Sequence, residues 1–299
     1  MNIINDLNID GVEILQKEPL SKRTTFGIGG CANFFLNIST IEALKTSVIY
    51  LNQNSLPYMV IGDGTNLLVT DSDLDIIFIK LVGDFKEISY TGDTIKAGAG
   101  VKLSDLAKDT LKRGFGGLEK IGSIPGSIGG ACLMNAGVRY FDISTYIESV
   151  GVIDKKGNVF EMPKETCKYS YRESIFQYTD EYIITHANLK LERTDTAPLW
   201  EVLNASVEKR KATQPKGKCA GCFFKNLNNQ SSGKLIEECG LKGLSVGDAY
   251  VAQEHGNFIM NRGNATAEDV LRLANIVKEE VRKQKGADLQ FEVRVIKNE

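Results

Sequence analysis

The chain has 299 residues, 42% hydrophobic and 25% charged, which is an ordinary globular composition with room for about two domains. Its formal net charge of −2 gives no electrostatic footprint for nucleic acid or an anionic membrane. No segment approaches the roughly 20 apolar residues that span a bilayer, and Asp6 and Asp10 stand where a signal peptide needs positive charge. We therefore expect a cytoplasmic protein with no nucleic-acid or membrane partner.

Predicted helices and strands alternate in the first half of the chain, with glycine-bearing loops between them. The apolar spacing and the turn residues predict an α and β mixture there. Gly62–Asn66 reads as a tight polar loop. In chain order, the expected elements are a helix over 39–51, strands over 56–68, 74–82 and 95–100, and a helix that Ser104 caps and that runs to Leu111.

Glycine is dense from Gly114 to Gly130, and it costs stability inside helices and strands. The segment Ile124–Gly130 could turn several successive N–H groups toward one anion, because glycine permits positive φ values. This predicts a phosphate-bearing cofactor. A Rossmann fingerprint is absent from the sequence, since Gly62-Asp63-Gly64 and Gly98-Ala99-Gly100 each lack the third glycine.

The later part of the chain begins with a polar, proline-bearing segment at Thr194–Leu199, where we place the domain boundary. A helix is expected over Trp200–Lys211, and a second one between a capping signal at Thr266 and Gly286. A strand is expected over Leu289–Val295. In this strand Glu292 falls on the polar face and is held by rigid scaffold.

Cys219-Ala220-Gly221-Cys222 forms a C-x-x-C motif, which could be a redox pair or half of a zinc site. A thioredoxin-type motif opens a helix after a strand, whereas this one precedes two phenylalanines, which argues against that type. Cys239 and His255 could complete a zinc set, but their spacing matches no zinc knuckle. We expect reduced thiols and no metal site.

Tyr169-Ser170-Tyr171-Arg172 alternates as an extended segment would, with the arginine placed among aromatic residues and before Glu173. Read alone, Arg172, Cys222 and Glu292 would each have a structural role, Arg172 in a surface salt bridge. Their combination with other motifs changes that interpretation.

Further motifs follow one another along almost the whole chain. They are Thr24–Gly30, Ile61–Leu68, Ile124–Ala131, Met134–Gly137, Tyr171-Arg172, Gly221–Asn226, Gly233–Ile236, His255–Phe258 and Phe291–Arg294. In these motifs and their order the chain resembles the UDP-N-acetylenolpyruvoylglucosamine reductases, the MurB family. It resembles the shorter type II subclass, because no long insertion follows Arg172.

The resemblance implies an α+β fold with a two-lobed FAD-binding domain of the vanillyl-alcohol-oxidase (PCMH) type over 1–195, its lobes meeting near residue 80. A substrate-binding α+β domain over 196–299 would follow, with its last strand packing back on the FAD domain. NADPH would reduce FAD, and the hydride would then pass to the enolpyruvyl group of a UDP-linked amino sugar. The product would be UDP-N-acetylmuramate, a peptidoglycan precursor. We expect a monomer or a weak oligomer.

The resemblance also assigns roles to residues. Arg172 would stabilise the enolate intermediate, Glu292 would stabilise or polarise it, and Cys222 would donate a proton where relatives commonly carry serine. Tyr171, Lys225 and Asn226 would contact the substrate. The implied FAD contacts are Gly62, Asp63, Gly64, Thr65, Asn66, Leu67, Gly98, Gly100, Gly122, Ser123, Ile124, Pro125, Gly126, Ser127, Gly129, Gly130 and Ala131.

Two departures from the family pattern leave alternatives open. Thr213 stands where many relatives carry a lysine near the substrate phosphates, so Lys211, Lys216 or Lys218 would replace it. Gly137–Tyr140 lacks the family's small-residue continuation of the flavin loop. Competing interpretations are a flavin oxidase with the same FAD domain and another substrate, and a non-enzymatic FAD- or nucleotide-binding module.

Overall fold

The computed structural model describes residues 9–227 and 230–298, which fold as two compact units. Unit 1 takes the described residues of 1–16 with 34–62 and 76–208. Unit 2 takes 17–33, 63–75 and the described residues of 209–299. The units therefore differ from the predicted domains, because two early segments fold with the C-terminal part of the chain. The domain boundary at 195/196 stays a prediction.

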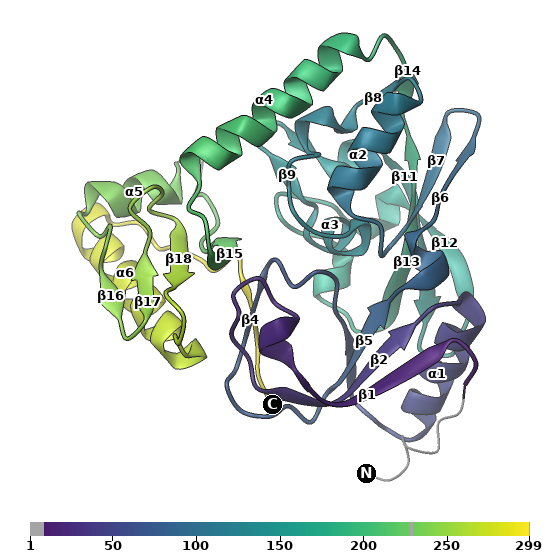
Figure 1. The fold of residues 1–299 in the computed structure, drawn as a ribbon, viewed down its shortest axis with the longest axis horizontal. Coiled ribbons are helices and arrows are strands. Elements are labelled where there is room, and N and C mark those ends of the chain that lie inside the picture. The colour runs from purple at the N-terminus through teal and green to yellow at the C-terminus, as the bar shows by residue number, and fades with distance from the viewer. Residues whose placement is uncertain (1–8, 228–229, 299) are drawn as a thin grey trace. The chain divides into compact units, whose positions relative to one another are not determined.

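The secondary structure mixes helices and short strands throughout (Figure 1). The α-helices are α1 (Ile41–Gln53), α2 (Leu103–Lys112), α3 (Ile128–Met134), α4 (Ala197–Thr213), α5 (Ser232–Glu238) and α6 (Ala267–Lys285). The strands are β1 (Val12–Pro19), β2 (Cys31–Ile38), β3 (Tyr58–Val60), β4 (Leu67–Val69), β5 (Ile77–Leu81), β6 (Ile88–Thr91), β7 (Thr94–Gly98), β8 (Phe115–Gly116), β9 (Gly137–Val138), β10 (Phe141–Asp142), β11 (Ile147–Asp154), β12 (Val159–Pro163), β13 (Tyr182–Lys190), β14 (Glu192–Arg193), β15 (Lys218–Cys222), β16 (Ser245–Val246), β17 (Ala249–Val251), β18 (Phe258–Asn261) and β19 (Arg294–Ile296).

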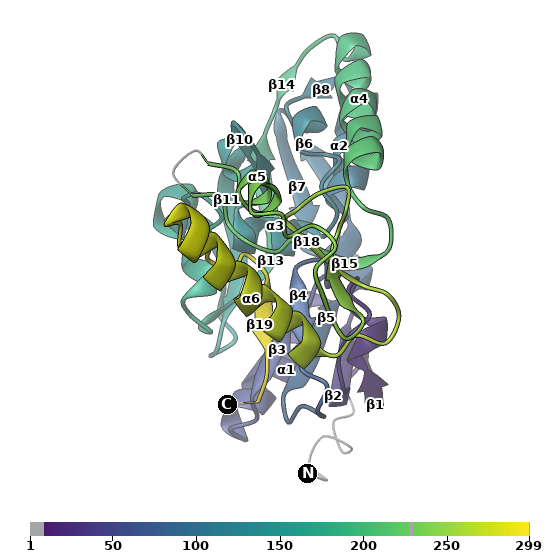
Figure 2. The same cartoon turned by 90° about the vertical axis from the view of Figure 1, so that its left-hand side faces the viewer.

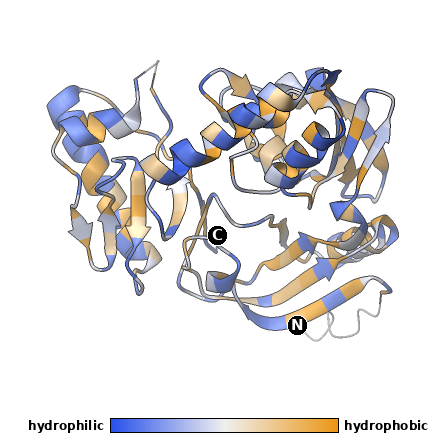
Figure 3. Cartoon of the chain, turned by 45° about the horizontal axis from the view of Figure 1, so that its top comes forward, coloured by the Kyte–Doolittle hydropathy of each residue, from blue (hydrophilic) through white to orange (hydrophobic). Residues whose placement is uncertain are grey.

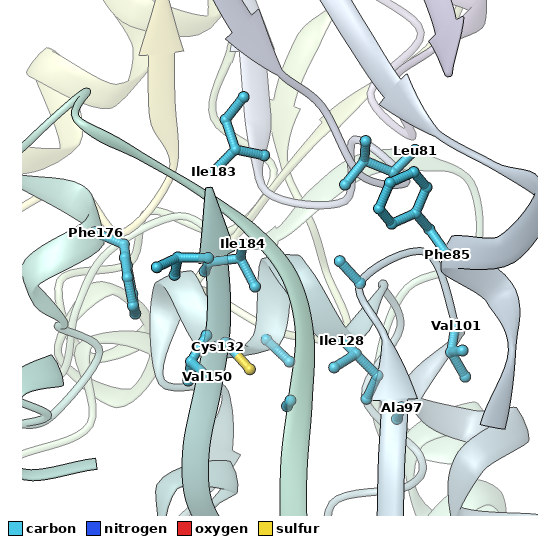
Figure 4. Packing of buried hydrophobic residues seen from close by; sticks show 14 of the residues in the cluster. Leu81, Phe85, Ala97, Val101, Ile128, Cys132, Val150, Phe176, Ile183 and Ile184 are labelled. Carbon is cyan, nitrogen blue, oxygen red and sulfur yellow. The ribbon is translucent and has the colours of Figure 1, made fainter. Parts of the chain in front are cut away.

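Unit 1 is built on a five-stranded antiparallel sheet of order β12-β11-β13-β7-β6. In a four-stranded sheet of order β1-β2-β5-β3, the central strand β5 pairs in parallel with β2 and with β3. Apolar side chains of these sheets form one core with α1, α2 and α3. Figure 4 shows Ile183 and Ile184 of β13 in this core with Ile128 and Cys132 of α3. This packing fixes α3, whose first turn contains the last two glycines of the glycine-rich stretch.

Unit 2 is built on an antiparallel sheet of order β15-β18-β17-β16 and on the long helix α6, which Figure 2 shows in full. The buried stripe of α6 includes Val270, Leu273 and Val277, and polar residues fill its other face. Figure 3 shows the resulting mixture of hydrophobic and hydrophilic residues along the helices. The last strand, β19, pairs in parallel with β4, so a segment of the predicted first domain joins this core.

Several predicted elements are confirmed. Helices α1 and α4 occupy the expected ranges within a few residues. Helix α6 begins with a capping box, in which Thr266 and Asp269 exchange side-chain and backbone hydrogen bonds. It ends at Gly286, which has φ of +66°.

Other expectations are wrong, each for a tertiary reason. Ser104 lies inside α2, whose N-cap is Lys102, because Lys102 forms an antiparallel bridge with Ser127. The expected strand over 56–68 is two strands that join different sheets around the polar loop. The expected final strand begins only at Arg294, because the preceding residues bond to a loop instead of a sheet.

No helix of the described residues is long and apolar enough to cross a membrane. The same part of the chain contains no group of three or more His, Cys, Asp or Glu side chains that could hold a metal ion.

Candidate active site

Three glycine-bearing segments of unit 1 meet at the start of α3. The Gly129 N–H donates to the Ala99 carbonyl at 2.9 Å, and the Ile128 N–H donates to the Val101 carbonyl at 2.8 Å. A Cβ added to Gly62 would lie 2.6 Å from Ser127 Oγ. The structure thus brings together predicted cofactor residues from segments near 62, 98–100 and 126–130.

Most of these glycines are required by the packing of the protein itself. A Cβ on Gly98 would overlap the Phe85 carbonyl oxygen, and one on Gly100 would lie 2.7 Å from the Leu81 carbonyl oxygen. A Cβ on Gly122 would lie 2.5 Å from Ala107 Cβ. At these positions the absence of a side chain is thus explained by close packing of neighbouring segments, and their contact with a cofactor stays a prediction.

Gly126 and Gly130 fit a phosphate-bearing cofactor better. Gly126 has φ of +126°, which side chains rarely tolerate. Gly130 is exposed, and the nearest atom to an added Cβ would be Ser127 Oγ at 3.6 Å. A group approaching the backbone here would meet little protein, which suits the pyrophosphate of FAD.

The predicted loop 62–67 is divided, because Gly62 belongs to unit 1 and Asp63–Leu67 to unit 2. Gly64 has φ of +63°, and its carbonyl accepts a hydrogen bond from the Thr25 N–H at 3.1 Å. The Asn66 side-chain amide donates to the Glu292 carbonyl at 3.1 Å, and the Asn66 carbonyl accepts from the Arg294 N–H at 3.1 Å. Asn66 of this loop therefore bonds to the main chain at both ends of the Glu292–Arg294 segment.

Arg172 lies at a tight turn of unit 1, not in an extended segment as expected. Ser170 and Glu173 form an antiparallel bridge, and Arg172 between them has φ of +57°. The turn aims the side chain back at the β9–β10 hairpin. The predicted alternation over Tyr169–Arg172 is therefore wrong at its last residue.

The Arg172 side chain is only 16% exposed, and acceptors of that hairpin hold its guanidinium. It donates to the Gly137 carbonyl at 2.6 Å and to Asp142 Oδ1 at 3.3 Å. Burial raises the pKa of the Asp142 carboxyl, and the Arg172 charge partly opposes that rise. The Gly137–Tyr140 stretch thus supplies one acceptor, the Gly137 carbonyl, that holds this positive charge, and Asp142 just beyond the stretch supplies another.

In unit 2, the segments that carry Cys222 and Glu292 run side by side. The Glu292 N–H donates to the Phe223 carbonyl at 2.9 Å, and the Lys225 N–H donates to the Gln290 carbonyl at 2.8 Å. Phe224 and Phe291 form an antiparallel bridge. Residues about 70 positions apart in sequence are therefore neighbours through main-chain bonds.

Three phenylalanine rings lock this pairing. The centroid of the Phe223 ring lies 5.3 Å from that of Phe224 and 5.2 Å from that of Phe291, and both pairs meet edge to face. Phe223 and Phe224 are each 1% exposed. Such aromatic pairs add about 0.5–1.5 kcal/mol each beyond the burial of area. The half-buried Cys222 and Glu292 thus stand at the edge of a rigid apolar cluster.

Asn257 is a positioning residue to which the sequence assigned no role. Its side-chain oxygen accepts from the Phe224 N–H at 2.9 Å, and its amide donates to the Phe224 carbonyl at 2.8 Å. It is 3% exposed, so these bonds satisfy a buried polar group. The His255–Phe258 motif was the available signal, but nothing in it indicated which main chain the amide would hold.

The predicted substrate contacts fall in both units. Tyr171 is exposed in unit 1 and lies beside the Arg172 guanidinium, 5.1 Å from ring centroid to Cζ. In unit 2, Lys225 is half-buried, and the exposed Asn226 accepts a hydrogen bond from the Ser232 N–H at 3.0 Å. Thr213 donates to the Lys209 carbonyl at 2.8 Å.

The three alternatives for the missing phosphate contact, Lys211, Lys216 and Lys218, are all exposed. The structure therefore leaves the choice among them open.

Two family models match the chain. The model described as "FAD binding domain" matches residues 32–163, and "UDP-N-acetylenolpyruvoylglucosamine reductase, C-terminal domain" matches residues 213–296. A UDP-N-acetylenolpyruvoylglucosamine reductase of Clostridium botulinum strain Hall is 39% identical over 287 residues, which are 96% of this chain and 93% of that protein. The chain belongs to the UDP-N-acetylenolpyruvoylglucosamine reductase family. The predicted family is thus confirmed.

Other members of this reductase family agree over the full length. A Bacillus velezensis relative is 37% identical and covers 99% of this chain and 98% of its own. Among solved structures, the UDP-N-acetylenolpyruvylglucosamine reductase (MurB) of Thermus caldophilus matches with a TM-score of 0.82 and 37% identity, over 96% of this chain and 99% of that chain.

A more remote structure supports the fold class of this reductase family member. The structure of a mutant cholesterol oxidase from Brevibacterium sterolicum matches 63% of this chain and 39% of that chain, with 12% identity and a TM-score of 0.50. At this identity the likeness concerns the fold alone. With the FAD-binding match over 32–163, it confirms the predicted α+β fold with an FAD-binding domain.

Proposed function

We propose that this protein reduces UDP-N-acetyl-3-O-(1-carboxyvinyl)-glucosamine to UDP-N-acetylmuramate with FAD and NADPH, in the cytoplasmic synthesis of peptidoglycan precursors. It would act as a monomer or a weak oligomer, without nucleic-acid partners. The observation that carries the proposal is the pairing of the segments of Cys222 and Glu292 inside the family's C-terminal domain. A thiol and a carboxyl group on adjacent, rigid backbone suit proton transfer to a carbon centre.

FAD, when bound, supplies at the substrate the hydride that it has received from NADPH. The residues proposed to hold it are those of the converging segments at Gly62, Gly98–Gly100 and Gly122–Ala131, together with Asp63–Leu67 of unit 2. Gly130 is proposed to admit a phosphate, because an added Cβ there would meet only Ser127 Oγ at 3.6 Å, and Gly126, with φ of +126°, lies close by in the chain. The other glycines shape this loop cluster by letting its segments approach one another.

Addition of hydride to the enolpyruvyl carbon C3 would leave negative charge at C2, which the adjacent carboxylate shares as an enolate. Arg172 is proposed to stabilise this charge, because its guanidinium is fixed before the reaction by Gly137 and Asp142. Glu292 is proposed to stabilise or polarise the same group. Preorganised charges of this kind lower the barrier without the cost of reorganising solvent.

Cys222 is proposed to complete the reaction by donating its proton to C2. A thiol with an ordinary pKa of about 8.5 releases a proton far more readily than a serine hydroxyl does. The Cys222 side chain is half-buried next to Phe258, which limits competing exchange with water. Tyr171, Lys225 and Asn226 are proposed to bind the substrate.

The direct test is the turnover of Cys222→Ala and Cys222→Ser enzymes. We expect the alanine variant to lose about 10²–10⁴-fold in kcat, the usual contribution of a general acid, and the serine variant to retain part of the activity. FAD content and stability should stay unchanged. Cys239→Ala is the matched control, because Cys239 is also a half-exposed thiol of unit 2.

Full turnover by Cys222→Ala would remove the proton-donor assignment. Oxidation of NADPH at a rate indifferent to the UDP-linked sugar would instead favour an oxidase with another substrate. Purified protein that stays colourless after FAD is added would argue against any flavoenzyme.

A further inference from the structure

Cys219 and Cys222 lie at the two ends of a β-bulge in unit 2. In the antiparallel pairing of β15 with β18, Cys219 faces Met260 and Cys222 faces Phe258. Three steps along β15 therefore oppose two steps along β18, and the register shifts between the two cysteines. Gly221 within the bulge has φ of +77°, a left-handed conformation that glycine tolerates without strain.

The bulge places both thiols on the same face of the sheet. Side chains three positions apart on a regular strand point to opposite faces, whereas Phe258 and Met260, two positions apart, share one face. Because each cysteine is paired with one of these two residues, the cysteines share that face as well. Both pack against the small apolar cluster that contains Phe258 and Met260.

The spacing of the pair is compatible with a bond between the sulfurs. The residues opposite them, Met260 and Phe258, stand two strand positions apart, a span of about 6.4–6.8 Å, near the upper end of the Cα separations found across disulfides, about 4.4–6.8 Å. A bond between the sulfurs would draw the two cysteines of the bulge closer together. Gly221 lies between the two cysteines and lets the backbone make that adjustment.

A cationic side chain lies within electrostatic reach of both thiols. Burial lowers the pKa of the Arg210 guanidinium, and the charges of Cys222 and Cys219 oppose this effect. Burial likewise raises the pKa of the Cys219 thiol, while Arg210 opposes that rise. The positive charge therefore favours the thiolate form, which is the nucleophile in thiol oxidation. Since burial disfavours the Cys219 thiolate, Cys219 is assigned the role of the resolving thiol.

We propose that Cys219 and Cys222 form a redox-modification site that a hydroperoxide converts to a reversible intramolecular disulfide. The effect on activity rests on the proposed role of Cys222 as proton donor, whereas the disulfide itself does not. Oxidation removes the transferable proton of Cys222, so turnover stops until a dithiol reduces the bridge. The C-x-x-C motif thus acquires a redox role on a strand, without the helix of a thioredoxin-type site.

The chemistry balances in two steps. The Cys222 thiolate attacks one peroxide oxygen, so that the O–O bond breaks, a sulfenic acid forms and hydroxide leaves and is protonated to water. The Cys219 thiolate then attacks the Cys222 sulfur, forms the S–S bond and displaces a second hydroxide, which is also protonated. The two thiols lose two protons and two electrons in total, and one hydrogen peroxide becomes two waters.

The sequence provides a simple test, because trypsin cleaves after Lys218 and after Lys225 and releases both cysteines in one peptide. The full-length holoenzyme is treated with hydrogen peroxide, its free thiols are alkylated and the protein is digested with trypsin. The mass of the 219–225 peptide is then measured by mass spectrometry. We expect an unalkylated peptide lighter by two hydrogens, with a parallel loss of activity that dithiothreitol restores. Dithiothreitol should also restore the alkylation of both cysteines.

The Cys219→Ser variant should keep the basal turnover but lose the resolving thiol. The same treatment should then add oxygen atoms to Cys222 as sulfinic or sulfonic acid, and dithiothreitol should not restore activity. Cys239→Ser is the matched control and should behave like the unmodified chain. An oxidised wild-type peptide that carries oxygen without losing two hydrogens would overturn the proposal, as would equal recovery of wild type and Cys219→Ser.

The peptide mass also separates this proposal from the proposed function. If the disulfide forms but the untreated enzyme does not reduce the UDP-linked sugar, the activity assignment fails and the redox site stands. If the untreated enzyme reduces the UDP-linked sugar normally, but peroxide oxidises Cys222 without forming a disulfide, only the redox site fails.

Discussion

The two units hold their candidate reactive groups in different ways. In unit 1, Arg172 is fixed through its side chain, by the Gly137 carbonyl and the Asp142 carboxylate. In unit 2, the segments of Cys222 and Glu292 are fixed through main-chain bonds and the adjoining phenylalanine rings. The contrast follows the chemistry. A permanent charge that is mostly buried needs acceptors around it, whereas groups proposed to act by proton transfer need a rigid backbone beneath them.

The units also use small residues and polar groups differently. In unit 1, Gly98 and Gly100 allow neighbouring segments to touch, and the buried His186 of the sheet is hydrogen-bonded to the Glu161 carboxylate. In unit 2, an aromatic cluster carries the contacts between distant segments. Three changes test this difference, from the largest expected effect to the smallest.

The largest effect is expected from removing the central ring of unit 2. Phe223 is 1% exposed and contacts both Phe224 and Phe291, so Phe223→Ala should leave a cavity and cost about 3–5 kcal/mol of unfolding free energy. Urea unfolding measures this loss. The control is Phe160→Ala, because Phe160 is 40% exposed in unit 1. If the two variants lose equal stability, the aromatic cluster is not what holds the Cys222 and Glu292 segments together.

An intermediate effect is expected from adding a methyl group to unit 1. Gly98→Ala forces a Cβ into the Phe85 carbonyl and should cost about 1–3 kcal/mol, as overpacking does. Gly130→Ala should fold normally, because its Cβ meets no atom nearer than 3.6 Å, but it should weaken FAD binding. Thermal unfolding and FAD titration of both variants separate the two roles. Equal FAD affinity in Gly130→Ala and the unmodified chain would remove Gly130 from the cofactor site.

The smallest effect is expected from acid. The His186 Nε2 and the Glu161 carboxylate lie 2.6 Å apart, and the other ring nitrogen lies 3.1 Å from Thr185 Oγ1. Burial lowers the pKa of His186, and the Glu161 charge only partly opposes this. The folded state therefore binds the proton less readily than the unfolded state. Neutral His186 therefore contributes fully to the stability of the folded state above the unfolded-state pKa of about 6.5, and this contribution is lost as the pH falls below that value.

Melting temperatures measured from pH 8 to pH 5 check this sign. We expect the decline below pH 6.5 to be shallower in His186→Gln than in the unmodified chain. The chain has one other histidine, His255, whose pKa burial also lowers, so part of the slope should remain. An unchanged slope in His186→Gln would place the acid sensitivity elsewhere.

Local signals in the sequence were sufficient wherever a short segment decides its own structure. The capping residues of α6 and its final Gly286 act within a few positions, and the structure confirms them. Ser104 shows the limit of such signals. It is a favourable N-cap residue, but the pairing of Lys102 with Ser127 starts the helix earlier. A contact with a residue 25 positions away outweighed local preference.

The same limit applies to the candidate site. The motifs singled out Arg172, Cys222 and Glu292, but the extended pattern around Arg172 gave no sign of its left-handed turn. The sequence likewise did not predict that Asn66 and Asn257 hold the main chain beside Glu292 and Phe224. Such bonds depend on which backbone a side chain meets after folding.

The sequence by itself determined the family, the α+β class and the capped helices, and it singled out the side chains proposed to react, because these depend on residue type and order. Only the tertiary structure decided which glycines serve packing, how the Cys222 and Glu292 segments pair, and that a bulge turns two cysteines of a C-x-x-C motif to one face. The physical reason is that register and close approach are set by contacts between segments distant in sequence, and no local pattern records them.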